Sequence, residues 1–100
     1  MVNNIKKLEI VIDFSYLKLL TRLLDDHNVP GYTIIKDVMG KGSRGNKDGH
    51  GISGGFKNCF VLLCLDEEEA PKVIELVKPL LQRSGGMALL SDAHWVYHKH

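Results

Sequence analysis

The sequence is poor in several residues that would point to a specialised class of protein. Its 100 residues include two cysteines, three prolines and one tryptophan. No apolar run reaches the length of a membrane-spanning helix, which needs about 18 residues. Cys59 and Cys64 lie in one apolar run, and on a strand they would point to opposite faces and should not pair. Because residues 1–7 are also too polar for a signal peptide, we expect a cytoplasmic protein with reduced thiols.

Neither sign of charge dominates the chain. Thirteen Lys and Arg against twelve Asp and Glu give a formal charge of +1, which excludes a globally basic nucleic-acid binder and an acidic tail protein. A hydrophobic content of 44% with 25% charged residues is typical of a folded chain. We expect one domain over residues 1–100, small enough that association with other copies would help its stability.

Glycine is concentrated in one segment. Seven of the ten glycines lie between Met39 and Gly55, together with Lys41, Arg44 and Lys47. A loop of this length in a small domain is typical of a functional or disordered segment. We expect residues 39–55 to be flexible alone and to be ordered by a ligand or partner. The alternative is a mobile hairpin connection without a function of its own.

The rest of the sequence predicts regular structure in the order β-α-β-β-α-β. Alternating apolar residues predict strands, and apolar residues at helical spacing predict helices. The predicted order is a strand at 7–13, a helix at 16–27 capped by Asp13 or Ser15, strands at 32–38 and 56–65, a helix at 70–83 and a strand at 87–95. This is the ferredoxin-like arrangement of the α+β class, an antiparallel four-stranded sheet with both helices on one face.

The spacing also predicts the buried face of each helix. In the first helix the apolar positions are Leu19, Leu20, Leu23 and Leu24. In the second they run from Ala70 to Leu81 at i, i+3, i+4 and i+7. Pro79 is expected to kink or fray the last turn of that helix, and Ser84–Gly86 to end it.

A second apolar face remains after the helices are placed. In the predicted strand at 56–65 both faces are apolar: Phe60, Leu62 and Cys64 on one side, and Cys59, Val61, Leu63 and Leu65 on the other. Met87–Leu90 is apolar on both faces too. Such a face would expose roughly several hundred Å² of apolar surface, more than soluble monomers usually show. We therefore infer a homo-oligomer with its sheets packed face inward.

The glycine-rich segment has the residues of an anion site. In Gly40–Gly45 the glycines let backbone N–H groups approach an oxyanion, Ser43 adds a hydroxyl, and Arg44 and Lys41 add positive charge. It is not a Walker P-loop, because that spacing is missing. Arg83–Gly86 is either a second anion cradle or the end of the preceding helix.

The histidines do not form a convincing metal site. His94, His98 and His100 share one strand face by parity, but near them only Asp92 has ligand spacing, which favours a solvated basic edge. No nucleophile, histidine and acid follow one another in a catalytic order, and His50 and Ser53 lie in the flexible segment. We expect neither a metal nor an enzyme.

Three segments resemble the P-II signalling superfamily. They are Gly31–Ile34, Gly40–Arg44 and Gly86–Tyr97, and they follow one another at similar spacing over nearly the whole chain. The chain is most similar to the P-II-like branch associated with carboxysomes and bicarbonate transporters. The pairing of the first two segments is the most specific part of the resemblance.

The resemblance implies a trimer that binds adenine nucleotides in the clefts between subunits. It makes residues 39–55 the T-loop, a flexible loop that docks on a transporter or enzyme. The implied nucleotide-binding residues are Gly31, Tyr32, Thr33, Gly40, Lys41, Gly42, Ser43, Arg44, Lys57, Gly85, Gly86, Met87, His98 and His100.

Three departures from the family pattern bear on the ligand. The spacing from Gly31 to Gly40 is one residue longer than usual, as a bulge would make it. Residues 39–55 contain no tyrosine, so the tyrosine nucleotidylation of the ammonium-linked branch cannot occur there. His98 and His100 align with an arginine pair that holds a triphosphate, which favours shorter phosphates.

These observations predict a sensor of adenine nucleotides without catalytic activity. We expect ADP or AMP to bind at least as well as ATP, with cyclic AMP as a further ligand and bicarbonate at the loop base. The expected partner is an inorganic-carbon transporter or a carboxysome-related protein, ahead of an ammonium transporter or nitrogen metabolism. Two alternatives remain: a small acylphosphatase-like enzyme, and a trimeric scaffold of the divalent-cation-tolerance type.

Overall fold

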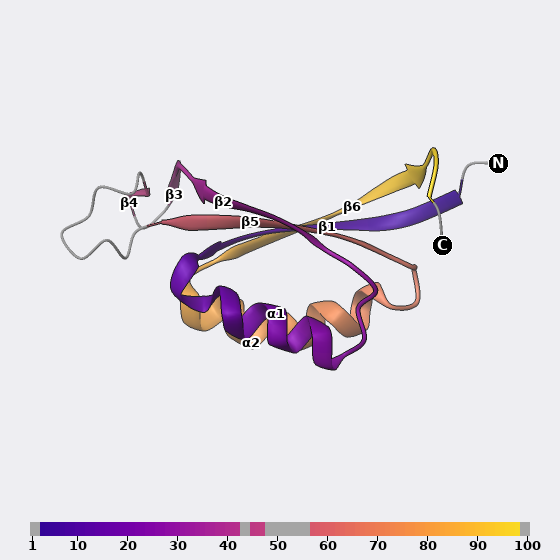
Figure 1. The fold of residues 1–100 in the computed structure, drawn as a ribbon, viewed down its shortest axis with the longest axis horizontal. Coiled ribbons are helices and arrows are strands. Elements are labelled where there is room, and N and C mark those ends of the chain that lie inside the picture. The colour runs from indigo at the N-terminus through magenta and orange to yellow at the C-terminus, as the bar shows by residue number, and fades with distance from the viewer. Residues whose placement is uncertain (1–2, 43–44, 48–56, 99–100) are drawn as a thin grey trace.

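The computed structural model describes residues 3–42, 45–47 and 57–98 (Figure 1). The elements are β1 (Asn3–Asp13), a 3-10 turn (Phe14–Tyr16), α1 (Leu17–Asp26), β2 (Thr33–Val38), β3 (Gly40–Gly42), β4 (Gly45–Lys47), β5 (Asn58–Leu65), α2 (Ala70–Ser84) and β6 (Met87–Trp95). No helix in these ranges is long and apolar enough to cross a lipid bilayer. The main elements follow the predicted order.

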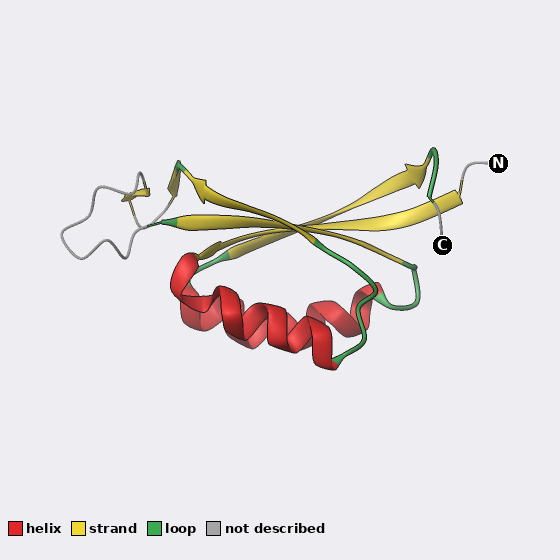
Figure 2. Cartoon of the chain, viewed as in Figure 1, coloured by secondary structure: helices red, strands yellow, loops and turns green. Residues whose placement is uncertain are grey.

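Four strands form one antiparallel sheet in the order β2-β5-β1-β6. Both helices lie on the same side of this sheet, and the other side carries no helix among the described residues (Figure 2). We call these sides the closed face and the open face. The arrangement confirms the predicted α+β, ferredoxin-like fold.

The core lies between the closed face and the helices. Along β5 the odd-numbered residues Cys59, Val61, Leu63 and Leu65 are buried, and Leu8, Ile10 and Ile12 of β1 lie beside them. The apolar stripe predicted for α2 is confirmed, with Ala70, Val73, Val77 and Leu80 buried. The stripe predicted for α1 is partly wrong. Leu17 is buried and Leu19 is exposed, because the stripe starts at the helix's first residue and continues at Leu20 and Leu24.

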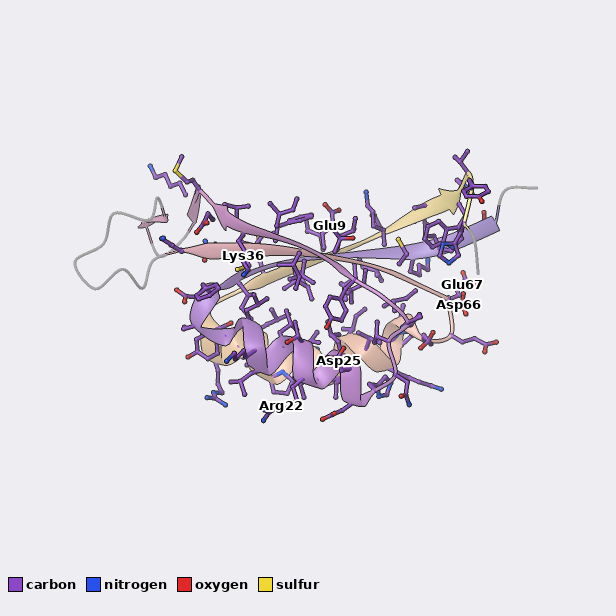
Figure 3. All side chains as sticks on the ribbon, viewed as in Figure 1. Glu9, Arg22, Asp25, Lys36, Asp66 and Glu67 are labelled. Carbon is purple, nitrogen blue, oxygen red and sulfur yellow. The ribbon has the colours of Figure 1, made fainter. Side chains whose placement is uncertain are left out.

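The open face keeps its apolar side chains without a cover from the described part of this chain. Leu89 and Ile35 are 56% and 52% exposed, and Phe60 and Leu62 are partly buried. Glu9 interrupts this surface: it pairs with Leu62 on one side and Leu89 on the other, and it points away from the helices (Figure 3). The apolar second face predicted from the sequence is therefore present.

Part of the glycine-rich segment is ordered as a hairpin. β3 and β4 pair in antiparallel register, with Gly40 opposite Lys47 and Gly42 opposite Gly45. The segment predicted as a flexible loop, residues 39–55, thus contains two short paired strands. Residues 43–44 and 48–56, including Ser43 and Arg44, lie outside the described ranges, as does the predicted strand start at Phe56.

β2 contains the bulge that its length predicts. Ile35 pairs with Phe60, but Val38 pairs with Asn58, so the register shifts by one residue between them. Asp37 sits in this shift with a φ of 59°, in the left-handed region. An extra residue in a strand moves each side chain after it to the opposite face of the sheet. Val38 consequently shares a face with Phe60, where uninterrupted alternation would have put it on the opposite side.

The start of α1 and the end of α2 lie at the same end of the sheet, and local structure fixes both. The Asp13 carboxylate accepts from the Ser15 backbone N–H at 2.9 Å, so Asp13 caps the 3-10 turn. The predicted cap of the first helix by Asp13 or Ser15 is wrong for α1 itself, because that helix begins after Tyr16 without a side-chain cap. α2 continues to Ser84, so Pro79 does not fray the last turn as expected. Gly85 then ends the helix in the left-handed conformation, with a φ of 72°.

Candidate functional site

One end of the sheet carries most of the residues predicted to hold phosphate. There Val38 of β2 and Asp13 of β1 both pair with Asn58, the first residue of β5. The first residue of β6, Met87, pairs with Val11 of β1, two residues from Asp13. We call this the loop end, because β3 and β4 project from it (Figure 1).

Lys57 and Asp37 meet at the loop end. The Lys57 Nζ lies 3.8 Å from the Asp37 Oδ1. The Lys57 backbone is fixed, since its carbonyl oxygen accepts the Phe14 N–H at 2.8 Å. Both side chains are at least half exposed, so an anion could reach the lysine from solvent. Lys41 in β3 is exposed too, and it adds a second cation at the loop end.

The Gly85–Met87 turn is closely packed against β1. A Cβ on Gly86 would lie 2.8 Å from the Val11 carbonyl oxygen, which only glycine avoids. The Gly86 N–H donates to the Leu81 carbonyl oxygen at 3.1 Å, with the Ser84 hydroxyl at 3.2 Å. The helix-ending reading of Arg83–Gly86 is therefore the observed one. Gly86 lets the turn approach the sheet, and its N–H is already engaged.

Gly31, Tyr32 and Thr33 lie away from the loop end. Thr33 pairs with Leu62, and it is exposed on the open face. The Tyr32 hydroxyl donates to the Asp25 carboxylate of α1 at 2.9 Å, and this hydrogen bond raises the pKa of Tyr32. Tyr32 therefore offers its backbone, because its ring packs against the core and its hydroxyl faces the helices. Gly31 is exposed with open space around it.

His98 lies at the opposite end of the sheet from the loop end. It stacks on Trp95 with ring centroids 4.1 Å apart and an interplanar angle of 16°. Trp95 pairs with Asn3, whereas Met87 pairs with Val11. About eight residues of strand separate these pairs and span about 27 Å. His100 lies outside the described ranges.

Within one chain the predicted site residues thus form separate groups. Gly40, Lys41, Gly42, Lys57, Gly85, Gly86 and Met87 lie at the loop end, Gly31–Thr33 lie near the middle of the sheet edge, and His98 lies at the far end. Such a distance is too great for one nucleotide to touch all three groups. Among the described residues no three His, Cys, Asp or Glu side chains cluster as metal ligands would.

Sequence reasoning missed Asp37 as a residue of the loop end. The available signal was the extra residue between Gly31 and Gly40, which predicted a bulge but did not identify the residue in it. The Asp37–Lys57 ion pair joins β2 to the residue before β5, and the whole glycine-rich segment lies between them in the sequence. Sequence spacing alone cannot show that pair.

Comparison with solved structures gives close matches in fold. CPII, a nitrogen regulatory PII-like protein from Thiomonas intermedia K12, is 28% identical with a TM-score of 0.84, over 95% of this chain and 91% of that one. That structure is bound to ADP, AMP and bicarbonate. A second CPII structure, bound to ADP, AMP and acetate, is 25% identical with a TM-score of 0.80, over 97% and 93% of the two chains.

A more distant match agrees in fold alone. A putative PII-like signalling protein from Thermus thermophilus is 21% identical with a TM-score of 0.75, over 95% of this chain and 92% of that one. A search of curated protein sequences finds no match. The family model described as nitrogen regulatory protein P-II matches residues 5–99. With this match over nearly all its length, and the fold described above, the chain belongs to the nitrogen regulatory protein P-II family.

Proposed function

We propose that this protein is a homotrimeric, cytoplasmic PII-like regulator that binds ADP or AMP, together with bicarbonate, in clefts between its subunits. Residues 39–55 are its T-loop, which the ligand orders and which contacts a membrane transporter for inorganic carbon or a carboxysome-related protein. The observation that carries the proposal is the separation of the predicted site residues within one chain. A second copy is required to bring them to one ligand.

The open face supports the association of copies. It presents Ile35, Met87 and Leu89, each about half exposed, and no element among the described residues covers it. At roughly 25 cal/mol per Å², hiding several hundred Å² of such surface favours association by several kcal/mol before the entropy cost. In the assembly, the loop end of one subunit would meet the Gly31–Thr33 edge or the His98 end of its neighbour.

The residues of the two groups are suited to different parts of a nucleotide. Lys41 and Lys57 provide cations at the loop end, where the phosphates are proposed to lie. Thr33 provides a hydroxyl on the open face, and the backbone of Gly31 and Tyr32 lies beside it, for ribose and adenine. His98 replaces an always-charged arginine of the resembled family pattern, and the weaker cation favours ADP and AMP over ATP.

The relatives of solved structure support the choice of ligands. CPII, at 28% identity, is bound to ADP, AMP and bicarbonate. A role in ammonium transport, as in the ammonium-linked branch of the family, remains the second candidate. Calorimetry that compares ADP and AMP with ATP distinguishes the two branches. A trimeric scaffold without a ligand would show no nucleotide binding at all.

The acylphosphatase alternative is not favoured by the geometry after β1. That enzyme class needs free backbone N–H groups there as an anion cradle. Here the Phe14 N–H donates to the Lys57 carbonyl oxygen at 2.8 Å, and the Ser15 N–H donates to Asp13. Two consecutive donors are therefore engaged within the chain. Release of phosphate from an acyl phosphate tests this alternative directly.

The decisive experiment is calorimetry with ATP, ADP, AMP and cyclic AMP, with and without bicarbonate, on protein whose mass is measured by light scattering. We expect a trimer that binds ADP and AMP. Arg44→Ala is expected to weaken ADP binding by about 1–3 kcal/mol, through loss of a charged hydrogen bond. Arg22→Ala, on the helical side (Figure 3), is the matched control and should leave binding unchanged. A monomer, or no adenylate binding, contradicts the proposed function.

A further inference from the structure

Asp37 has an unusual backbone conformation at the loop end. Its φ of 59° is in the left-handed region, and among the described non-glycine residues only Asn28 shares it. Aspartate and asparagine tolerate this conformation better than other side chains. The residue lies in the register shift of β2, between the Ile35–Phe60 and Val38–Asn58 pairs. The sheet on both sides of the shift therefore fixes where Asp37 sits.

The partner of Asp37 is also held by the sheet. Lys57 immediately precedes β5, and its carbonyl oxygen binds the Phe14 N–H. The next cation along β2, Lys36, lies 5.8 Å from the Phe14 ring centre and so has an aromatic neighbour of its own. The 3.8 Å approach of Lys57 and Asp37 therefore joins two positioned backbones across the base of the glycine-rich segment.

We propose that Asp37 is a specificity residue of the loop end: its carboxylate occupies Lys57 when no phosphate is bound, and it opposes ligands with longer phosphate chains. This inference rests on the proposed function, since it takes Lys57 as a contact of the phosphates. A phosphate oxygen replaces the Asp37 carboxylate at the lysine. The bulge keeps the displaced carboxylate beside the site, where it repels the ligand in proportion to its charge.

The charge of the Asp37 carboxylate predicts an order of affinity among the ligands. The repulsion between two charges scales with their product, so a carboxylate near the phosphates disfavours ATP most, then ADP, then AMP. Because Asp37 and Lys57 are exposed, the effect is modest and falls with added salt. An uncharged ligand such as adenosine should not respond to this carboxylate.

The test compares Asp37→Asn with the native protein. Asparagine tolerates the same backbone conformation and removes only the charge. We expect the variant to bind AMP about twofold, ADP about threefold and ATP about fivefold more tightly at low salt, with the differences shrinking in about 0.5 M salt. In a Lys57→Gln background the same substitution should give a smaller gain, because only the repulsion remains and the competition for the lysine is lost. Equal affinities in the native protein and Asp37→Asn overturn the proposal.

A matched control is available on the outer surface of α2. The Glu75–Lys78 pair has nearly the same geometry and exposure, with Nζ and Oε1 3.9 Å apart. Glu75→Gln changes the net charge by the same amount as Asp37→Asn. It should leave nucleotide affinity unchanged. A gain as large in Glu75→Gln would show that net charge alone is responsible, and it would overturn the role given to Asp37.

A second measurement does not depend on nucleotide binding. Acetylation of lysines by an active ester, followed by peptide mass spectrometry, reports how available each amine is. We expect Lys57 to react about twofold faster in Asp37→Asn, with Lys78 as the internal reference, since a paired amine is less available. Inorganic tripolyphosphate should protect Lys57, and at lower concentration in the variant.

The outcomes separate this inference from the proposed function. Unchanged Lys57 reactivity in Asp37→Asn, or no protection by tripolyphosphate, overturns the role of Asp37. Protection of Lys57 by tripolyphosphate with the expected dependence on Asp37, but no calorimetric binding of any adenylate, supports the role of Asp37 and contradicts the nucleotide function.

Discussion

The two faces of the sheet are built from the same strands, yet one is covered and the other is not. On β5 Val61 and Leu63 are almost fully buried, while their neighbours Leu62 and Cys64 are only partly buried. The residue types are nearly the same on both sides. The amino-acid composition of a strand therefore determines how much apolar surface must be buried. The topology decides which half is covered by the chain's own helices.

The largest effect is expected for a core substitution on the closed face. Leu63→Ala removes a fully buried side chain and should lower the free energy of unfolding by about 2–5 kcal/mol. Leu62→Ala, one residue away on the open face, should cost about 1 kcal/mol in the folding of a single chain. Urea unfolding of both substitutions in a dissociated background such as Leu89→Glu measures them in the single chain. Equal losses would mean that the two faces are equally buried in the isolated chain, contrary to the structure.

A substitution on the open face is expected to have an intermediate effect, on the assembly of the subunits. Leu89→Glu adds a second carboxylate opposite Glu9 and removes an apolar contact worth about 1–2 kcal/mol per subunit if the face is covered by another copy. Light scattering should show the mass falling from three subunits to one. Leu19→Glu, at an exposed leucine of α1, is the control and should leave the mass unchanged. A trimer that survives Leu89→Glu would place the subunit contact elsewhere.

The smallest effect is a difference in thiol reactivity between the faces. Cys59 is fully buried on the closed face, and burial raises the pKa of its thiol, so less of the reactive thiolate forms at a given pH. Cys64 is partly exposed on the open face. In a thiol-labelling assay at about pH 8, Cys64 should react before Cys59 in dissociated protein.

Assembly should change that labelling. If the open face is the subunit contact, Cys64 reacts more slowly in the trimer than in a dissociated variant such as Leu89→Glu, while Cys59 remains slow in both. Faster labelling of Cys59 than of Cys64 would contradict the assignment of the two faces.

Sequence patterns predicted buried side chains best where contacts within one chain bury them. The helical spacing in α2 predicted which side chains face the core, because the sheet covers that helix within the chain. The alternation in β5 predicted two apolar faces but not which of them the helices cover. The start of α1 was harder. A 3-10 turn precedes the helix, so its buried stripe begins at Leu17 rather than at the predicted Leu19.

The candidate site was predicted less completely, for a physical reason. Its residues come from strand ends, a helix end and an edge strand, and their distances depend on register and on the proposed subunit contact. The sequence identified Gly86 as important, but only the structure shows the Val11 carbonyl oxygen that excludes a Cβ there. The orientation of Tyr32 toward Asp25 likewise depends on packing between α1 and β2.

The bulge in β2 has a consequence for how such a protein can diverge. β2 is an edge strand with a single hydrogen-bonded neighbour, so one added residue disturbs one ladder and leaves the buried layer intact. Gaining or losing that residue turns the projecting hairpin to the other side of the sheet. A change of length at this spot can thus redirect a contact surface in a single evolutionary step, without any repacking beneath it.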